Sequence, residues 1–201
     1  HTDETTVSFE PFQIITNSFS WLNPQTDKQG YLIEAWLENG QCGVTALDVS
    51  SDWTTYPRYG YVTELYADQS TERNAEIIDQ LSKNYHINCL QYYDWMWRHE
   101  NVIKKNYAGN IISPWVDWRG KSISLEVLQD SIAKANSRAI AAMPYFQIYM
   151  ALDGYENLSG VSPEWGLYRD TAHSEQYSHD PGVNMWLFDP GNSDWQNHMF
   201  A

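Results

Sequence analysis

The sequence is poor in cysteine and in long apolar runs, and each shortage excludes a class of protein. Two cysteines, Cys42 and Cys89, in 201 residues are too few for a disulfide scaffold. Both stand in apolar surroundings, so we expect two buried, small apolar side chains. No run of about 18 apolar residues is present, which argues against a membrane-spanning helix. No recognisable signal peptide follows His1, and because that residue is not Met we expect an upstream segment to be missing.

Positive charge is also scarce. The chain has 12 Lys and Arg against 26 Asp and Glu, a formal net charge of −14. A phosphate backbone or an anionic membrane surface would be repelled, so we expect no nucleic-acid partner and no membrane insertion. The partner should be neutral or cationic, although an acidic surface can also serve solubility alone.

Aromatic residues, by contrast, are abundant. The chain contains 10 Trp and 14 Tyr, and aromatic residues make up 15% of it. Their rings offer flat apolar faces with a polar group at the edge, which suits the C–H faces and hydroxyl rims of sugars. A tryptophan-rich core is the alternative that composition alone leaves open.

The first part of the chain reads as antiparallel β-structure. Residues 7–15 and 31–37 are rich in β-forming side chains, and turn-forming residues separate them. Residues 1–41 are too few to fold alone as a sandwich. We therefore interpret them as the C-terminal strands of a truncated β-sandwich domain.

Strands and helices alternate after residue 42. The helices are indicated by apolar residues at helical spacing and by cap residues: Ser70 or Thr71, Ser124, and a capping-box pattern that begins at Ser193. An apolar run without alternation is typical of a buried parallel strand. The expected strands are 44–49, 87–93 and 139–149, the expected helices 71–85, 125–135 and one from 193, and the long loops 100–121 and 152–181.

This alternation predicts an α/β fold with a parallel sheet. The loops that leave the strands are long and aromatic, as in barrel enzymes whose sites lie at the carboxyl ends of the strands. A complete (β/α)₈ TIM barrel needs about 250 residues, so residues 42–201 have room for its first three βα units.

The end of the second expected strand is the richest candidate site. Strand alternation sends Gln91, Tyr93 and Trp95 to one face and Asp94 to the other, and His99 follows closely. Acceptors and donors beside aromatic rings suit a neutral polyol. The alternative is an amphipathic strand end whose tryptophans pack against helices.

The other two strand ends supply further tyrosines. Tyr59 and Tyr61 follow the first expected strand, and Tyr145 and Tyr149 lie on the third. We assign these four residues to substrate contact, with core tyrosines whose hydroxyls are satisfied as the alternative.

A catalytic pair is not assigned. Glycoside hydrolysis usually needs two carboxylates that flank the scissile bond. Asp94, Asp153 and Asp189 are available, but nothing in the sequence places two of them together. His173 and His179 lack a recognisable metal-site spacing, so we expect no metal and no other cofactor.

Three segments carry a family resemblance. They are 45–53 with 57–60, the run 87–99 (INCLQYYDWMWRH), and 189–197. Together they resemble glycoside hydrolase family 66, which contains dextranases and cycloisomaltooligosaccharide glucanotransferases. The resemblance covers most of residues 31–201.

The resemblance implies an immunoglobulin-like β-sandwich before a (β/α)₈ barrel. It also implies a retaining enzyme that acts on the neutral α-1,6-glucan of dextran. We expect the protein to be secreted and to be either extracellular or on the cell surface. The family's nucleophilic Asp and acid/base Glu follow later strands, so we expect both beyond residue 201 and no catalytic residue within this chain.

Three other functions stay open at this point. They are a cyclising glucanotransferase of the same family, another barrel enzyme acting on a different α-glucan, and a non-catalytic glycan-binding module. Binding modules are usually β-sandwiches without βαβ units, so the alternation after residue 42 favours an enzyme.

Overall fold

The chain forms two compact units. The structure, a computed structural model, describes residues 12–16, 18, 25–40, 42–179 and 185–201. One unit covers His1–Asp52 and the other Trp53–Ala201, and each is described by itself. The predicted boundary after residue 41 lies within the first of these units.

The first unit contains an antiparallel hairpin. Strand β1 (Gln29–Trp36) pairs with β2 (Cys42–Val49) along its whole length. The prediction that 44–49 is a buried parallel strand is therefore wrong, because a short connection joins two adjacent antiparallel strands and an apolar run alone does not distinguish the two arrangements. The strand expected over 7–15 lies mostly outside the described residues, and 12–15 form no strand.

The hairpin is open to solvent in this unit. Cys42 is exposed, so its predicted burial is wrong, whereas Cys89 of the second unit is buried as expected. Leu32, Trp36 and Val44 are 57–66% exposed.

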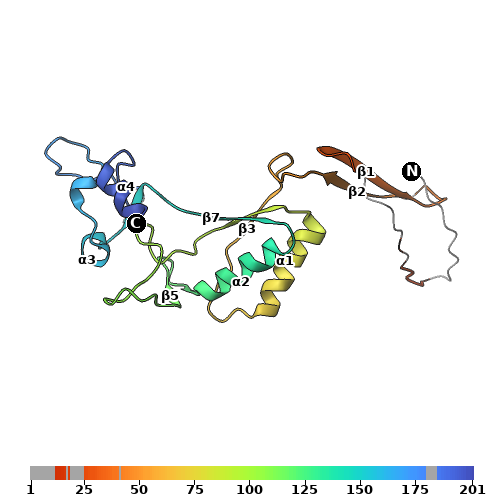
Figure 1. Cartoon of the computed structure of the whole chain (residues 1–201), viewed down its shortest axis with the longest axis horizontal. Coiled ribbons are helices and arrows are strands. Elements are labelled where there is room, and N and C mark those ends of the chain that lie inside the picture. The colour runs from red at the N-terminus through yellow and green to blue at the C-terminus, as the bar shows by residue number, and fades with distance from the viewer. Residues whose placement is uncertain (1–11, 17, 19–24, 41, 180–184) are drawn as a thin grey trace. The chain divides into compact units, whose positions relative to one another are not determined.

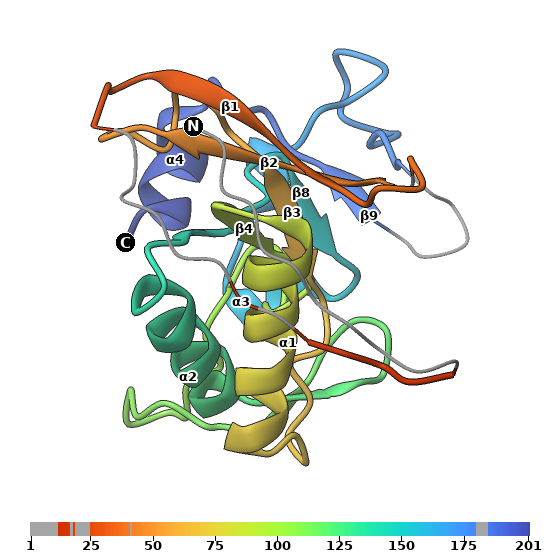
Figure 2. The same cartoon turned by 90° about the vertical axis from the view of Figure 1, so that its right-hand side faces the viewer.

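A three-stranded parallel sheet organises the second unit. Its order is β3 (Tyr59–Val62), β4 (Cys89–Tyr92) and β7 (Ala141–Pro144). Helix α1 (Thr71–Tyr85) joins β3 to β4, and α2 (Leu125–Asn136) lies between β4 and β7 in the chain. Both helices lie side by side on the same side of the sheet (Figures 1 and 2). The predicted α/β alternation is thus confirmed for these elements.

Cap residues fix where the helices begin. The side chain of Ser70 accepts a hydrogen bond at the start of α1, and Ser124 does the same for α2. These caps were predicted, because a Ser side chain can satisfy the free N–H groups of a first turn. For α4 (Ser193–Met199) the cap is Asn192, one residue before the predicted Ser193.

The main core lies between the sheet and the two helices. Val62 of β3 and Leu90 of β4 face Ile78 of α1 and Leu128 of α2, and each of these side chains is at most 4% exposed. Burying four such side chains from water stabilises the unit by several kcal/mol. The helices therefore cover one face of the sheet and leave the other face free of them.

The rest of the second unit consists of short elements. Where a strand was predicted over 139–149, the sheet strand β7 covers only Ala141–Pro144. Short helices and strands also occur in and next to the predicted loops. These elements are β5 (Trp115–Val116), β6 (Ser122–Ile123), β8 (Met150–Leu152), α3 (Tyr155–Ser159), the 3₁₀ helix η1 (Pro163–Trp165) and β9 (Met185–Leu187), which pairs antiparallel with β8.

A buried ion pair ties the loop after β4 to this region. Arg98 and Glu100 are 9% and 3% exposed and are paired with each other. Arg98 donates from Nη2 to the carbonyl oxygens of Leu152 and Asp153, both at 2.7 Å. Glu100 accepts from the backbone N–H of Leu152 at 3.1 Å and from the hydroxyl of Ser159 at 2.9 Å. These two charges fasten β8 and α3 to the strand end.

Candidate functional site

The sheet face that the helices leave free carries aromatic side chains. Tyr61 of β3, Gln91 of β4 and Met143 of β7 are in register, so their side chains lie on one face. Tyr59 shares this face and is 54% exposed, while Tyr61 is 66% exposed. The two tyrosines and Gln91 therefore share one face of the sheet.

The carboxyl ends of β4 and β7 bring two further tyrosines into contact. Pairing continues one step past the strands, because the N–H of Tyr145 donates to the carbonyl of Tyr92 at 2.8 Å. The rings of Tyr93 and Tyr145 lie 4.5 Å apart between centroids, tilted by 41°. Tyr149, 42% exposed, and Asp94 are close enough to influence the Tyr145 hydroxyl electrostatically. We call Tyr93, Asp94, Tyr145 and Tyr149 the strand-end cluster.

The hydroxyl of Tyr145 has a fixed position within this cluster. Burial, assisted by the neighbouring Tyr93 and Tyr149, raises its pKa to about 12, so it stays a neutral phenol at physiological pH. Its hydroxyl donates to Oε1 of Gln147 at 2.6 Å, and Gln147 is itself 5% exposed. The ring of Tyr93 and the side chain of Gln147 therefore both hold Tyr145 in place.

Asp94 is held by an arginine that sequence reasoning missed. Arg119 places Nη1 2.9 Å from Oδ2 of Asp94 and Nη2 2.7 Å from Oδ2 of Asp117. Asp117 also accepts from the backbone N–H groups of Arg119 and Lys121 at 2.9 and 2.8 Å. The Asp94 carboxylate is thus a fixed acceptor, held by a guanidinium that it shares with Asp117, which suits hydrogen bonding to a sugar hydroxyl. No local sequence pattern indicates this anchor, because Arg119 lies 25 positions after Asp94.

The predicted strand alternation ends at Asp94, which has a φ of 51°. The left-handed conformation turns the chain, so Trp95 and Met96 are both buried, at 9% and 2% exposure. Trp95 lies in the core and donates from Nε1 to the carbonyl oxygen of Tyr145 at 2.8 Å. Trp95 therefore supports Tyr145 from the core, whereas strand alternation predicted that its ring would lie on the open face of the sheet.

His99 is likewise buried. It is 3% exposed, and its Nδ1 has no hydrogen-bond partner among the described residues. Burial lowers its pKa, and the negative charges of Glu100 and Asp94 oppose that shift without cancelling it. The imidazole is therefore neutral at pH 7.

The buried His99 predicts acid sensitivity. Because its pKa is lower in the folded state than the ordinary value of about 6.5, the unfolded chain binds a proton more readily. The contribution of neutral His99 to the free energy of unfolding is then complete above pH 6.5, and it is lost as the pH falls towards the folded-state pKa. We expect the melting temperature of His99→Gln to fall less between pH 7 and pH 5 than that of the unaltered protein. His179→Gln, at an exposed histidine, should leave the dependence unchanged; equal curves for all three proteins would contradict the assignment.

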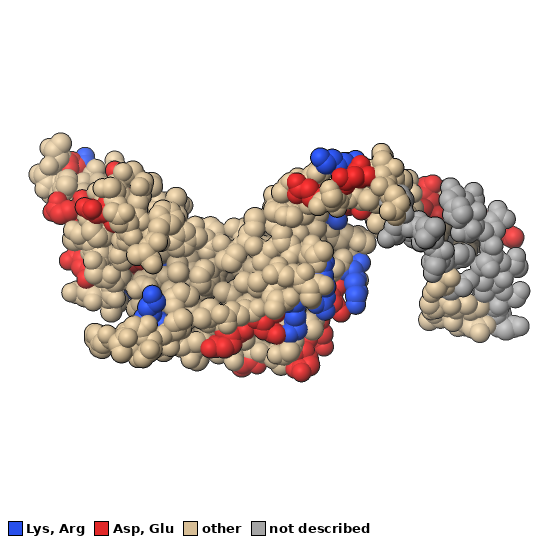
Figure 3. All heavy atoms as spheres, viewed as in Figure 1, with Lys and Arg blue, Asp and Glu red and all other residues tan. Residues whose placement is uncertain are grey.

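Charge is distributed unevenly over the second unit. In Figure 3 acidic and basic side chains gather over α1 and α2, whereas the surface over β7 on the same view is largely uncharged. Within the described ranges no three His, Cys, Asp or Glu side chains are grouped to hold a metal ion. None of the helices there is long and apolar enough to cross a membrane.

Comparison with known proteins decides the family. The sequence model of glycosyl hydrolase family 66 matches residues 1–201. The chain belongs to this family. The resemblance seen in the three sequence segments is therefore confirmed.

Family 66 relatives are similar along most of the chain. A cycloisomaltooligosaccharide glucanotransferase of Niallia circulans is 39% identical over 204 aligned positions, covering 100% of this chain and 21% of that protein. A dextranase of Streptococcus salivarius is 22% identical, covering 92% of this chain and 24% of that protein. The chain thus spans about a fifth to a quarter of these relatives' length.

A solved structure supports the fold as well. The crystal structure of a cycloisomaltooligosaccharide glucanotransferase of Paenibacillus sp., complexed with cycloisomaltoheptaose, matches with a TM-score of 0.78 and 43% identity. The match covers 90% of this chain and 26% of that chain. The mixed α/β arrangement is therefore that of part of a family 66 enzyme.

Proposed function

We propose that this chain is part of a retaining enzyme that cleaves α-1,6-glucosidic linkages in dextran, and that the strand-end cluster binds glucose units of the substrate. The observation that carries this proposal is the pair of contacting rings of Tyr93 and Tyr145 beside the anchored carboxylate of Asp94, in a chain of family 66. Aromatic faces and a fixed acceptor are the groups that a neutral sugar ring requires.

The architecture we propose is a (β/α)₈ barrel of which residues 53–201 form the first three βα units. The parallel order β3-β4-β7 with intervening helices supports it. The first barrel strand is then β3 and not 44–49. Residues 1–52, including the β1–β2 hairpin, would form the last strands of an immunoglobulin-like β-sandwich, which moves the predicted boundary from 41 to 52.

In such a barrel the helix-free face of the sheet points inward. Tyr59, Tyr61 and Gln91 would then line the interior below the strand-end cluster. Trp95 and His99 are buried, and Trp95 contributes by holding the backbone of Tyr145 through its indole N–H. The proposed site thus includes all nine residues predicted from the sequence, seven of them on its open side or rim.

The chain's chemical role is to bind and orient. In a retaining reaction one carboxylate attacks the anomeric carbon while a second carboxylic acid protonates the leaving oxygen. Neither role falls to Asp94 in this proposal, because Arg119 already occupies one of its oxygens. We place the attacking Asp and the acid/base Glu beyond residue 201.

A cyclising glucanotransferase is the second candidate. Its reaction differs only in the acceptor, since a hydroxyl of the same glucan chain, and not water, attacks the covalent intermediate. The higher identity to two glucanotransferases, 39% and 43% against 22% for the dextranase, favours it. Because dextran is a polymer too large to cross a membrane, both candidates imply an extracellular location.

Product analysis with dextran tests the proposal. The complete protein is incubated with dextran and its products are separated and weighed by mass spectrometry. Linear isomaltooligosaccharides indicate a dextranase, and products lighter by one water indicate cyclisation. No product from dextran, with release of sugar from another α-glucan, would contradict the proposed linkage.

A further inference from the structure

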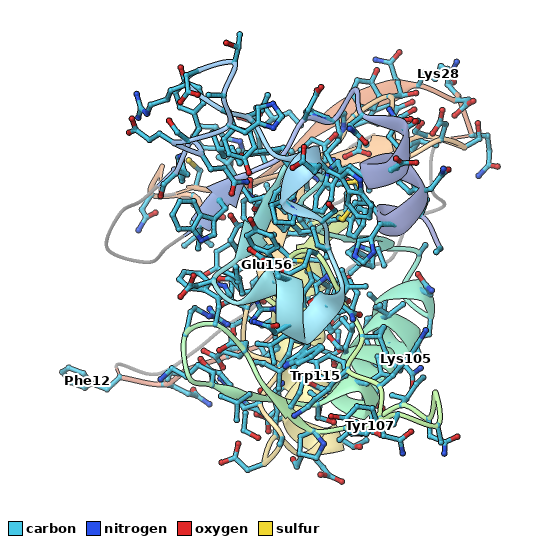
Figure 4. All side chains as sticks on the ribbon, turned by 90° about the vertical axis from the view of Figure 1, so that its left-hand side faces the viewer. Phe12, Lys28, Lys105, Tyr107, Trp115 and Glu156 are labelled. Carbon is cyan, nitrogen blue, oxygen red and sulfur yellow. The ribbon has the colours of Figure 1, made fainter. Side chains whose placement is uncertain are left out.

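A cleft lies in the part of the chain between β8 and β9, and none of its lining residues belongs to the strand-end cluster. This cleft has a volume of about 470 Å³, within the range of small-ligand sites. Glu156 of α3, labelled in Figure 4, lies on its wall. The side chains that the argument uses are Asp153, Glu156, Asn157, Tyr168, Gln176 and Trp186.

Hydrogen bonds hold the walls of this cleft in place. Trp186 donates from Nε1 to Oδ1 of Asp153 at 3.3 Å. The hydroxyl of Tyr155 donates to Oε1 of Gln176 at 2.9 Å, and Nε2 of Gln176 donates to the carbonyl of Leu187 at 3.0 Å. A preformed wall lowers the entropy cost of binding a ligand.

Gly166 makes room for the glutamine. A Cβ atom at this position would lie 2.5 Å from Nε2 of Gln176, too close for any side chain without a shift. A side chain at residue 166 would therefore displace the amide of Gln176 from its position in the cleft wall.

An aromatic stack also lines the cleft. The rings of Tyr168 and His173 lie 4.4 Å apart and almost parallel, at 6°. Tyr168 is anchored by its hydroxyl, which donates to the carbonyl oxygen of Pro163 at 3.0 Å. Nδ1 of His173 lies 3.3 Å from a carboxylate oxygen of Glu164, which fixes the imidazole.

The lining chemistry selects the class of ligand. Asp153 and Glu156 contribute carboxylates and Asn157 an amide, while none of the described residues around the cleft is Lys or Arg. An anion would be repelled, and a metal ion would need a group of ligands that the described residues do not form. Acceptor oxygens beside aromatic rings fit a ligand that donates many hydroxyl hydrogens and has apolar faces.

We propose that this cleft is an accessory site for a neutral saccharide, namely a stretch of the same glucan chain on which the proposed function acts. The inference rests on that function for the identity of the glucan, but not for the chemistry of the cleft. A polymer held there stays attached to the protein between reaction events, so the cleft should matter for long substrates and not for short ones.

The test is affinity electrophoresis of the complete protein in gels that contain dextran. Trp186→Ala should weaken retardation by roughly tenfold, the loss of one aromatic contact with a sugar ring. The double variant Asp153→Asn/Asn157→Ala alters exposed positions and should also weaken it without unfolding the chain. Tyr107→Ala is the matched control, since Tyr107 is fully exposed on a hairpin distant from Glu156 in Figure 4. Activity on a short isomaltooligosaccharide should be unchanged in all of these variants.

The outcomes separate this proposal from the previous one. Normal dextran retardation by folded cleft variants, together with activity on dextran, would overturn the accessory site and leave the proposed function intact. If the protein proves inactive on dextran, gels with other neutral glucans are used. If the cleft substitutions weaken retardation in one of these gels, the saccharide site is supported. If they leave migration unchanged in all of the gels, the site is overturned.

Discussion

Arg98→Met is expected to lower the free energy of unfolding by about 3–5 kcal/mol, because it leaves a buried carboxylate without its partner. The side chain of Glu100 is completely buried and that of Arg98 is 10% exposed. The change also leaves the carbonyl oxygens of Leu152 and Asp153 without their donor. Denaturant unfolding of the complete protein, followed by tryptophan fluorescence, measures the loss.

An exposed ion pair provides the control. Arg73 lies 3.5 Å from Glu76, and both side chains are more than half exposed. Arg73→Met should therefore cost at most about 1 kcal/mol. The double variant Arg98→Met/Glu100→Gln should be less harmful than the sum of its single changes, since the uncompensated charge is gone. Similar losses for Arg98→Met and Arg73→Met would show that the buried pair does not fasten this region.

Tyr93→Ala is expected to lower kcat/KM for dextran by roughly 10- to 100-fold, which corresponds to about 1.4–2.7 kcal/mol of transition-state binding. The change removes a ring that is 37% exposed and lies against Tyr145 at the strand end. Tyr93→Phe keeps the ring and should retain more of the activity than Tyr93→Ala. Initial rates over a range of dextran concentrations provide the measurement.

The control for this prediction is another exposed tyrosine. Tyr85 is 60% exposed at the end of α1, outside the proposed site. Tyr85→Ala should leave kcat/KM unchanged. If Tyr93→Ala behaved in the same way, with its melting temperature preserved, the strand-end cluster would have no part in substrate binding.

Much of the second unit follows directly from sequence patterns. Helices α1 and α2 combine apolar residues at helical spacing with a serine cap, and both signals depend only on neighbouring residues. Strand β4 is marked by an apolar run that ends in polar and aromatic residues. The alternation of Gln91 and Tyr93 with the buried Tyr92 is local as well, so this part of the candidate site could be predicted.

Other features depend on contacts between distant residues. The run 44–49 has the composition of a buried parallel strand, but its pairing with β1 is fixed by the hairpin connection. The left-handed backbone at Asp94 sends Trp95 into the core, and a period-two pattern cannot anticipate such a turn. Arg119 reaches Asp94 across 25 positions in the sequence, so no local pattern links the two residues.

The central claim is that the strand-end cluster holds a glucose unit of an α-1,6-glucan. The most direct measurement is a crystal structure of the complete protein with a bound isomaltooligosaccharide. We predict a sugar ring in van der Waals contact with Tyr93 or Tyr145 and a sugar hydroxyl hydrogen-bonded to Asp94. A structure in which other protein side chains cover these three residues, with the sugar bound elsewhere, would contradict the account.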